Sequence, residues 1–100
     1  MAEYQVTCIN KPDRTSRHDY ITHIGNIQAN WRMTRELAIA QIEAKANAFY
    51  TIDRISGARA YLGVVREAGK APYLRTYADG VWNDNLLALS ECGTSCTVVG

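Results

Sequence analysis

Residues 73–92 read Tyr-Leu-Arg-Thr-Tyr-Ala-Asp-Gly-Val-Trp-Asn-Asp-Asn-Leu-Leu-Ala-Leu-Ser-Glu-Cys, and this stretch indicates the fold more clearly than any other. Its first part alternates aromatic or basic side chains with small or apolar ones, which is typical of a strand with two unlike faces. Asp79-Gly80 then predicts a turn, while Trp82 and the apolar residues 86–89 are expected to close the core. The stretch predicts a kind of domain but not a reaction, because it carries no complete catalytic or metal-ligand set.

The length and charge of the chain limit its class. At 100 residues it is expected to fold as a single domain over residues 1–92, followed by a loosely ordered tail over residues 93–100. Eleven Lys plus Arg against ten Asp plus Glu leave a net charge of +1. That balance argues against a protein that binds nucleic acid or anionic membrane mainly through its net positive charge. Any such contact must come from a local patch.

The compartment is inferred from hydropathy and cysteine usage. No run reaches the roughly 20 apolar residues that a membrane helix needs, and the first residues lack the basic flank and apolar core of a signal peptide. We therefore expect a cytoplasmic protein. The chain has three cysteines, and the odd count favours reduced thiols, with a Cys8–Cys92 or a Cys92–Cys96 disulfide as the alternative.

Hydrophobic periodicity predicts one helix among strands. Thr34 is a suitable N-cap, residues 34–46 contain no Gly or Pro, and Ile39 and Ile42 fall on one apolar stripe. Residues 25–33 are expected to form a loop anchored by Trp31. The predicted strands are residues 4–10 and 20–24 as a hairpin, 49–55 and 58–66 as a second hairpin, and 73–78. The fold class is therefore α+β, with a mostly antiparallel sheet, the order β-β-α-β-β-β and the helix packed on one face.

Several motifs resemble one small family. Residues 73–76, Asp79-Gly80 and residues 84–92 are similar to the C-terminal signature of the family called domain of unknown function 3892. His23-Ile24, Trp31, Thr34-Arg-Glu, Ile42-Glu43 and Phe49-Tyr50 also have that family's spacing, so the resemblance covers residues 3–92. The family name implies no activity, and no residue roles are carried over from it.

The chain departs from that family at two places. Ser90 stands where the family pattern has a proline, and residues 44–48 replace the glycine at which the family's helix ends. We therefore expect a longer helix and a looser final turn in this chain.

Strand alternation predicts a functional face. Tyr73, Arg75 and Tyr77 should point away from the helix, because the small apolar residues between them suit the core. If Ser56-Gly57 is a two-residue turn, Ile52 pairs with Tyr61, Tyr50 with Gly63, and Arg54 with Arg59. The candidate site residues on this face are Tyr50, Arg54, Arg59, Tyr61, Tyr73, Arg75 and Tyr77.

Two kinds of partner fit such a face. Tyr and Arg are favoured at protein interfaces, so our first hypothesis is a non-enzymatic binding or adaptor domain that contacts a second copy or another protein. Two opposed arginines repel unless an anion lies between them. The second hypothesis is therefore a nucleotide-like or single-stranded nucleic acid ligand, stacked on tyrosines and held by arginines.

The remaining reactive residues give weaker hypotheses. Cys8 with His23 could make a cysteine nucleophile, and fast alkylation of Cys8 or Cys92 would reveal it. Cys92 and Cys96 have a tolerable spacing for zinc, with Cys8, His18 and His23 as further ligands. A buried thiol and a hydrogen-bonded histidine explain the same residues more simply. We expect no metal and no cofactor, because no glycine-rich phosphate loop or full ligand set is present.

Overall fold

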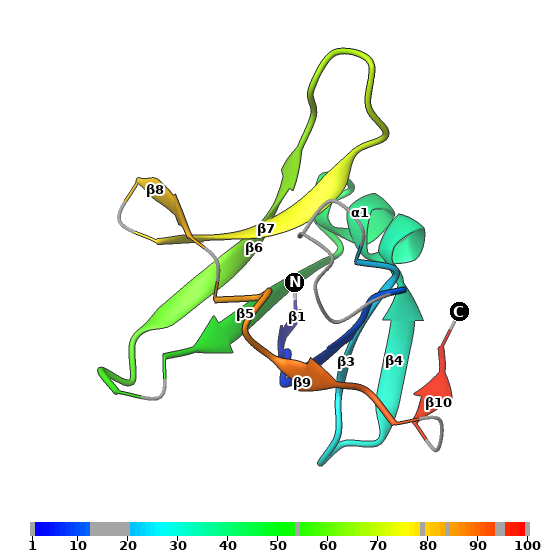
Figure 1. The fold of residues 1–100 in the computed structure, drawn as a ribbon, viewed down its shortest axis with the longest axis vertical. Helices are drawn as coiled ribbons and strands as arrows, with labels where there is room; N and C mark the ends of the chain where they lie inside the picture. Colours follow the sequence, from blue (N-terminus) through cyan, green and yellow to red (C-terminus); the bar gives the residue numbers. More distant parts are fainter. Residues whose placement is uncertain are drawn as a thin grey trace.

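The computed structural model describes residues 2–12, 21–53, 55–78, 80–83, 85–93 and 96–99. Within these residues it confirms the predicted α+β class, with a single helix among strands (Figure 1). In chain order the elements are β1 (Ala2–Gln5), β2 (Cys8–Asn10), β3 (His23–Asn26), β4 (Trp31–Thr34), α1 (Arg35–Glu43), β5 (Asn47–Ile52), β6 (Arg59–Val65), β7 (Tyr73–Ala78), β8 (Val81–Asn83), β9 (Ser90–Glu91) and β10 (Thr97–Val98).

The strands form two sheets. The first, called sheet A here, has the order β1-β5-β6-β7-β8, and the second, sheet B, has the order β10-β4-β3-β2-β9. The expectation of a mostly antiparallel sheet was wrong, because β1 runs parallel to β5, β2 to β9 and β10 to β4. Both sheets are therefore mixed. Parallel pairs join segments far apart in the chain, so no local turn motif in the sequence predicts them.

The first predicted strand, residues 4–10, is divided between the two sheets. β1 pairs with β5 in sheet A, and β2 pairs with β3 in sheet B. Between them, the Val6 N–H donates to the Tyr50 carbonyl at 2.7 Å, and the Thr7 N–H donates to the Gly25 carbonyl at 2.9 Å. The chain passes from one sheet to the other at these two residues, and the buried Val6 side chain fills the core at the crossing.

Residues 25–33 are not the predicted loop. Gly25 and Asn26 continue β3, residues 27–30 form a tight turn, and β4 returns antiparallel to β3. Asn30 closes the turn with φ of 61°, a left-handed conformation that asparagine tolerates better than most residues. A Cβ at Gly25 would lie 2.4 Å from the Trp31 carbonyl oxygen, so the close approach of β4 requires glycine there.

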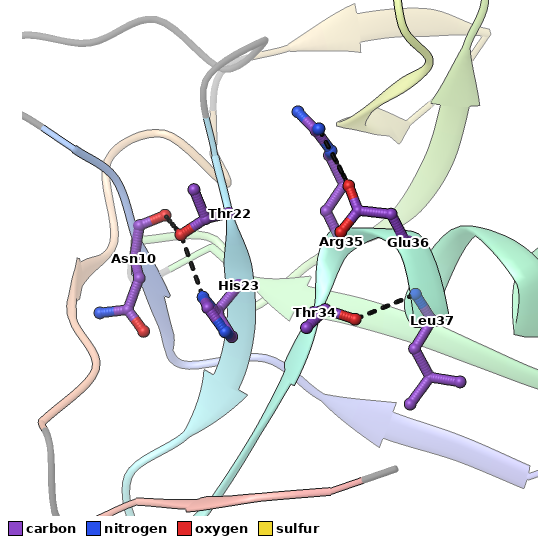
Figure 2. A network of polar contacts seen from close by, with 7 residues as sticks. All are labelled: Asn10, Thr22, His23, Thr34, Arg35, Glu36 and Leu37. Carbon is purple, nitrogen blue, oxygen red and sulfur yellow. Dashed lines mark hydrogen bonds and ion pairs between the residues drawn. The ribbon is translucent and has the colours of Figure 1, made fainter.

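The helix begins where the sequence predicts. The Thr34 hydroxyl accepts a hydrogen bond from the Leu37 N–H at 3.2 Å, as an N-cap does (Figure 2). The preceding strands hold this start in place, since His23 pairs with Thr34 and the Arg35 N–H donates to the Thr22 carbonyl at 2.8 Å. The N-cap prediction is confirmed.

The helix ends earlier than predicted. α1 stops at Glu43, and Lys45 adopts φ of 57°. The Ala46 N–H donates to the Gln41 carbonyl and the Lys45 N–H to the Ile42 carbonyl, which is the hydrogen-bond pattern of a Schellman motif. The missing glycine therefore does not lengthen the helix. Lys45 takes the left-handed conformation instead, at a cost that glycine would avoid.

Replacing Lys45 by glycine should therefore stabilise the protein. Lys45→Gly removes the strain between Cβ and the following carbonyl, and should raise the free energy of unfolding by about 1 kcal/mol. Urea denaturation followed by circular dichroism measures this. Ala44→Gly is the matched control, because Ala44 has φ of −78° and gains nothing from glycine. It should lose about 0.5–1 kcal/mol. Equal effects of the two changes would contradict the assignment.

The hairpin of β5 and β6 exists, but its predicted register was wrong. Tyr50 pairs with Tyr61 and Ile52 with Arg59, two residues away from the register of a two-residue turn. Asp53 causes the difference. Its Oδ1 accepts hydrogen bonds from the Ile55 and Ser56 N–H groups at 2.8 and 3.0 Å, while its own N–H donates to the Ala58 carbonyl. The turn is thus an aspartate-capped loop.

The two sheets and the helix share one core. Phe49, Leu62 and Leu74 of sheet A pack in one cluster with Ile9 and Ile24 of sheet B. The helix and the turn after β8 complete it with Ala38, Ile39 and Leu86. No helix among the described residues is long and apolar enough to span a membrane.

The segment near the C-terminus adds to sheet B. Thr97 and Val98, within the region expected to be a loose tail, form β10 beside β4, and the Val99 N–H donates to the Arg32 carbonyl at 2.8 Å. Side chains hold the same segment. The Asn10 amide donates to the Cys92 carbonyl at 3.0 Å, and Arg32 donates to the Cys96 carbonyl at 3.3 Å and to the Asn10 amide oxygen at 3.2 Å.

Cys8 and Cys92 form a disulfide, so the expectation of reduced thiols was wrong for this pair. β2 and β9 are parallel neighbours with Cys8 opposite Ser90. Cys92 follows β9 directly, and its N–H donates to the Ile9 carbonyl at 2.9 Å, which keeps its Cα atom within 4.9 Å of that of Cys8. Cys96 keeps its thiol, and it packs with the disulfide in a second small buried cluster. Of the two pairings left open by the sequence, the structure selects the one that spans 84 residues.

Reduction of this disulfide should strongly destabilise the protein. A bond between residues 84 apart in the chain restricts the unfolded state, and its loss is expected to cost about 4 kcal/mol. Chemical denaturation with and without a phosphine reductant measures the loss. Cys92→Ala should abolish the response to reductant, whereas Cys96→Ala should keep it. A denaturation midpoint that the reductant leaves unchanged in the unmodified chain would contradict the pairing.

Candidate binding surface

The two faces of sheet A differ sharply. Phe49, Leu62 and Leu74 point into the core, where each is nearly inaccessible to solvent. Because side chains alternate along a strand, the neighbouring Tyr50, Tyr61 and Tyr77 lie on the opposite face. That face points away from the core that the helix and sheet B cover, as strand alternation predicts. We call it the outer face of sheet A.

Four aromatic residues form a row across this face. Tyr50 is paired with Tyr61, Tyr61 with Tyr77, and Tyr77 with Trp82, so each of four adjacent strands contributes one ring. Ring centroids lie 5.9 Å apart for Tyr50 and Tyr61, and 5.6 Å apart for Tyr77 and Trp82. Three strand spacings make the row about 15 Å long. Tyr61, Tyr77 and Trp82 remain 38%, 46% and 41% exposed, so much of their surface is open to a partner.

One ion pair lies beside the row. The Arg59 guanidinium carbon sits 4.1 Å from the centre of the Tyr50 ring, in cation–π geometry. Glu3 of β1 accepts hydrogen bonds on the same carboxylate oxygen from Tyr61 at 2.8 Å and from Arg59 at 3.1 Å. The local charge is thus balanced: Arg59 is paired with Glu3 and lies opposite Ile52, not opposite Arg54 as the predicted register implied.

The other predicted site residues have different positions. Tyr73 is only 4% exposed, and its hydroxyl donates to Glu67 at 2.9 Å. Arg75 is paired with Gly63 and is partly buried, with its Nε donating to the Asn83 carbonyl at 3.3 Å. Arg54 lies outside the described residues. The structure therefore brings together Tyr50, Arg59, Tyr61 and Tyr77 as an open surface, but not all seven residues.

Trp82 belongs to this surface and not to the core. Its ring passes over Gly63, where a Cβ would lie only 2.9 Å from the Trp82 Cη2 atom. The sequence held a signal for this placement, since the predicted Asp79-Gly80 turn implies the pairing of Ala78 with Val81 and of Tyr77 with Trp82 that the structure has. Asp79 itself lies outside the described residues. Glu3 was missed because nothing local predicts a parallel pairing of β1 with β5.

His23 and the cysteines do not form a reactive pair in this structure. Cys8 is opposite Gly25 and bonded to Cys92, while His23 is opposite Asn10. The His23 Nδ1 lies 3.0 Å from the Thr22 hydroxyl, which in turn donates to the Asn10 carbonyl (Figure 2). Partial burial, followed by the positive charge of Arg32, lowers the pKa of His23, and Glu36 opposes the shift.

Metal ligands are likewise not gathered. Among the described residues no group of three or more His, Cys, Asp or Glu side chains is arranged to hold a metal ion. His18, one of the zinc ligands considered from the sequence, falls outside those residues.

The fold and this surface define a small α+β domain with an exposed aromatic sheet face. The chain matches the family described as "Protein of unknown function (DUF3892)" over residues 5–90, and it belongs to that family. The resemblance expected from the sequence is thereby confirmed. A search of curated proteins and a search of solved structures each gave no significant match.

The contact between Gly63 and Trp82 yields a test of the surface geometry. Gly63→Ala should push the indole away from the sheet, costing about 1 kcal/mol and shifting tryptophan emission to longer wavelength. In a Trp82→Ala background the same change should stabilise the strand by about 0.5 kcal/mol, because alanine suits a strand better than glycine. Thermal denaturation of the four proteins in this double-mutant cycle measures the coupling. Additive effects would mean that Trp82 does not cover Gly63.

Proposed function

We propose that this protein is a small non-enzymatic binding domain that contacts a protein partner through the outer face of sheet A. The observation that carries the proposal is the row Tyr50, Tyr61, Tyr77 and Trp82, three of whose rings are more than one third exposed. Tyrosine and tryptophan are enriched at the centres of interfaces, where they supply large contact areas at a low entropic cost. A row held in register by strand pairing is also pre-organised for contact.

The partner that this face favours is a second copy of the chain. A two-fold interface brings one patch against itself, so it must be self-complementary. The face combines aromatic rings, which stack on one another, with one exposed cation and one exposed anion in Arg59 and Glu3. In a two-fold pair, Arg59 of each copy would meet Glu3 of the other.

We do not propose a cytoplasmic location, because a disulfide such as Cys8–Cys92 persists most readily in oxidising compartments.

A nucleotide-like or single-stranded nucleic acid ligand is the second candidate. The aromatic row favours it, since successive bases can stack on rings presented by a sheet. The charge balance counts against it: Glu3 pairs with Arg59, and phosphate would have to displace that carboxylate. A nucleotide or nucleic acid ligand is therefore less well supported than a protein partner.

Removing two rings of the row should weaken self-association. In analytical ultracentrifugation across a wide concentration range, we expect the unmodified chain to show a reversible dimer. The double variant Tyr61→Ala, Tyr77→Ala should raise the dimer dissociation constant at least about tenfold, equivalent to about 1.4 kcal/mol. Ile27→Ala is the matched control, because Ile27 is 46% exposed in the turn between β3 and β4, outside the row.

Two results would decide against self-association through this face. One is a chain that stays monomeric at every concentration, and the other is a dimer that the double variant and Ile27→Ala weaken equally. Quenching of tryptophan emission by oligothymidylate at low salt, lost in the double variant Tyr61→Ala, Tyr77→Ala, which keeps Trp82 as the reporter, and retained in Ile27→Ala, would instead support the second candidate.

A further inference from the structure

A cavity of about 320 Å³ lies where the two sheets meet the helix, away from the outer face of sheet A. It draws its walls from β1 and β5 of sheet A, from β4 and the residue after β10 of sheet B, and from α1. Its lining residues are Tyr4, Trp31, Met33, Gln41, Asn47 and Val99. The size lies at the small end of the range for ligand sites. None of the six side chains is charged.

Aromatic and apolar groups form most of the cavity wall. The Tyr4 and Trp31 rings meet edge to face, with centroids 6.2 Å apart. Phe49 packs behind both of them, 5.9 Å from Tyr4 and 6.2 Å from Trp31, and it is fully buried. Tyr4 nevertheless remains 44% exposed, although it belongs to this aromatic cluster. A flat apolar molecule would cover the exposed part of its ring.

Two amide side chains supply the polar part of the cavity. The Asn47 Nδ2 donates to the Gln41 Oε1 at 3.0 Å, which fixes both amides against each other. Among the described residues neither side chain makes another hydrogen bond. One N–H₂ group and one carbonyl oxygen of the pair thus remain available. This result does not depend on how the amides are oriented, since turning both over again leaves one donor and one acceptor.

We propose that this cavity binds an uncharged, planar molecule that carries an N–H group beside a carbonyl, as a lactam does. The pair offers such a molecule both hydrogen-bond partners: the Asn47 oxygen would receive the ligand N–H, and the Gln41 N–H₂ group would donate to the ligand carbonyl. Neutral ligands are selected because none of the described lining residues offers a counter-charge, and an unpaired ion would lose its hydration without compensation. This site is independent of the proposed protein interface.

Two related compounds test the chemistry directly. 2-Quinolone is a flat bicyclic lactam, and N-methyl-2-quinolone has the same rings without the donor. Titrating each into the ¹⁵N-labelled protein, we expect 2-quinolone to bind with a dissociation constant on the order of 1 mM. The side-chain amide signals of Gln41 and Asn47 should move. The N-methyl compound should bind at least about tenfold more weakly, since it leaves the Asn47 and Gln41 acceptor without a partner.

A matched pair of variants tests the protein side. Gln41→Met keeps the length of the side chain but removes the N–H₂ group that would donate to the ligand carbonyl. It should weaken both compounds, because each carries that carbonyl, with about a tenfold loss for 2-quinolone. Gln28→Met, in the exposed turn between β3 and β4, should change neither affinity. The proposal is overturned if the two compounds bind equally, if neither shifts any signal, or if the shifts lie on the outer face of sheet A. The comparison of compounds holds even if Gln41→Met does not fold.

Discussion

The fold depends on one short segment that serves both sheets. Residues 2–5 extend sheet A at its edge, while residues 8–10 lie inside sheet B between β3 and β9. The two backbone N–H groups between them are satisfied in different sheets, Val6 by Tyr50 and Thr7 by Gly25. Since buried backbone donors must be paired, this crossing fixes the distance and angle between the sheets. The side chains of Val6, Cys8 and Ile9 then fill the space that the crossing encloses.

The same constraint creates the two surfaces that carry the proposals. With sheet B and the helix on one side of sheet A, the opposite side is left open, and strand pairing aligns its aromatic residues. The pocket lined by Tyr4, Trp31 and Gln41 lies where β1 and β4 meet the helix. One surface is wide and carries charge of both signs. The other is a pocket whose described lining residues carry no charge, so the two suit different classes of partner.

Local signals in the sequence predicted local structure well. Thr34 marked the helix start, residues 73–78 matched β7, and the alternation of Leu74 with Tyr77 gave the correct faces. The predicted register of the β5–β6 hairpin was wrong, because Asp53 accepts hydrogen bonds from backbone N–H groups and builds a longer turn than Ser56-Gly57 suggested. The predicted helix end was wrong, because Lys45 adopts the left-handed conformation that glycine normally provides.

The candidate site was predicted in part for the same reason. Tyr50, Tyr61 and Tyr77 followed from alternation within strands, whereas Glu3 came from a parallel pairing across more than 40 residues of chain, which no local pattern reports. The position of Trp82 could have been predicted, because the turn expected at residues 79–80 implies its pairing with Tyr77. The division into two sheets, which determines what is buried, depends on contacts between distant segments and could not be read from any single stretch.

The disulfide turns nearly the whole domain into a closed ring. Cys8 lies near one end of the chain and Cys92 near the other, so β3 to β9 and the helix all fall between them. A protease that cut one exposed turn, such as residues 27–30, would open the ring without releasing a fragment. The nicked molecule would gain only one water molecule and keep its core, and its two fragments would separate only after reduction. The bond thus makes the integrity of the domain independent of the continuity of any one loop.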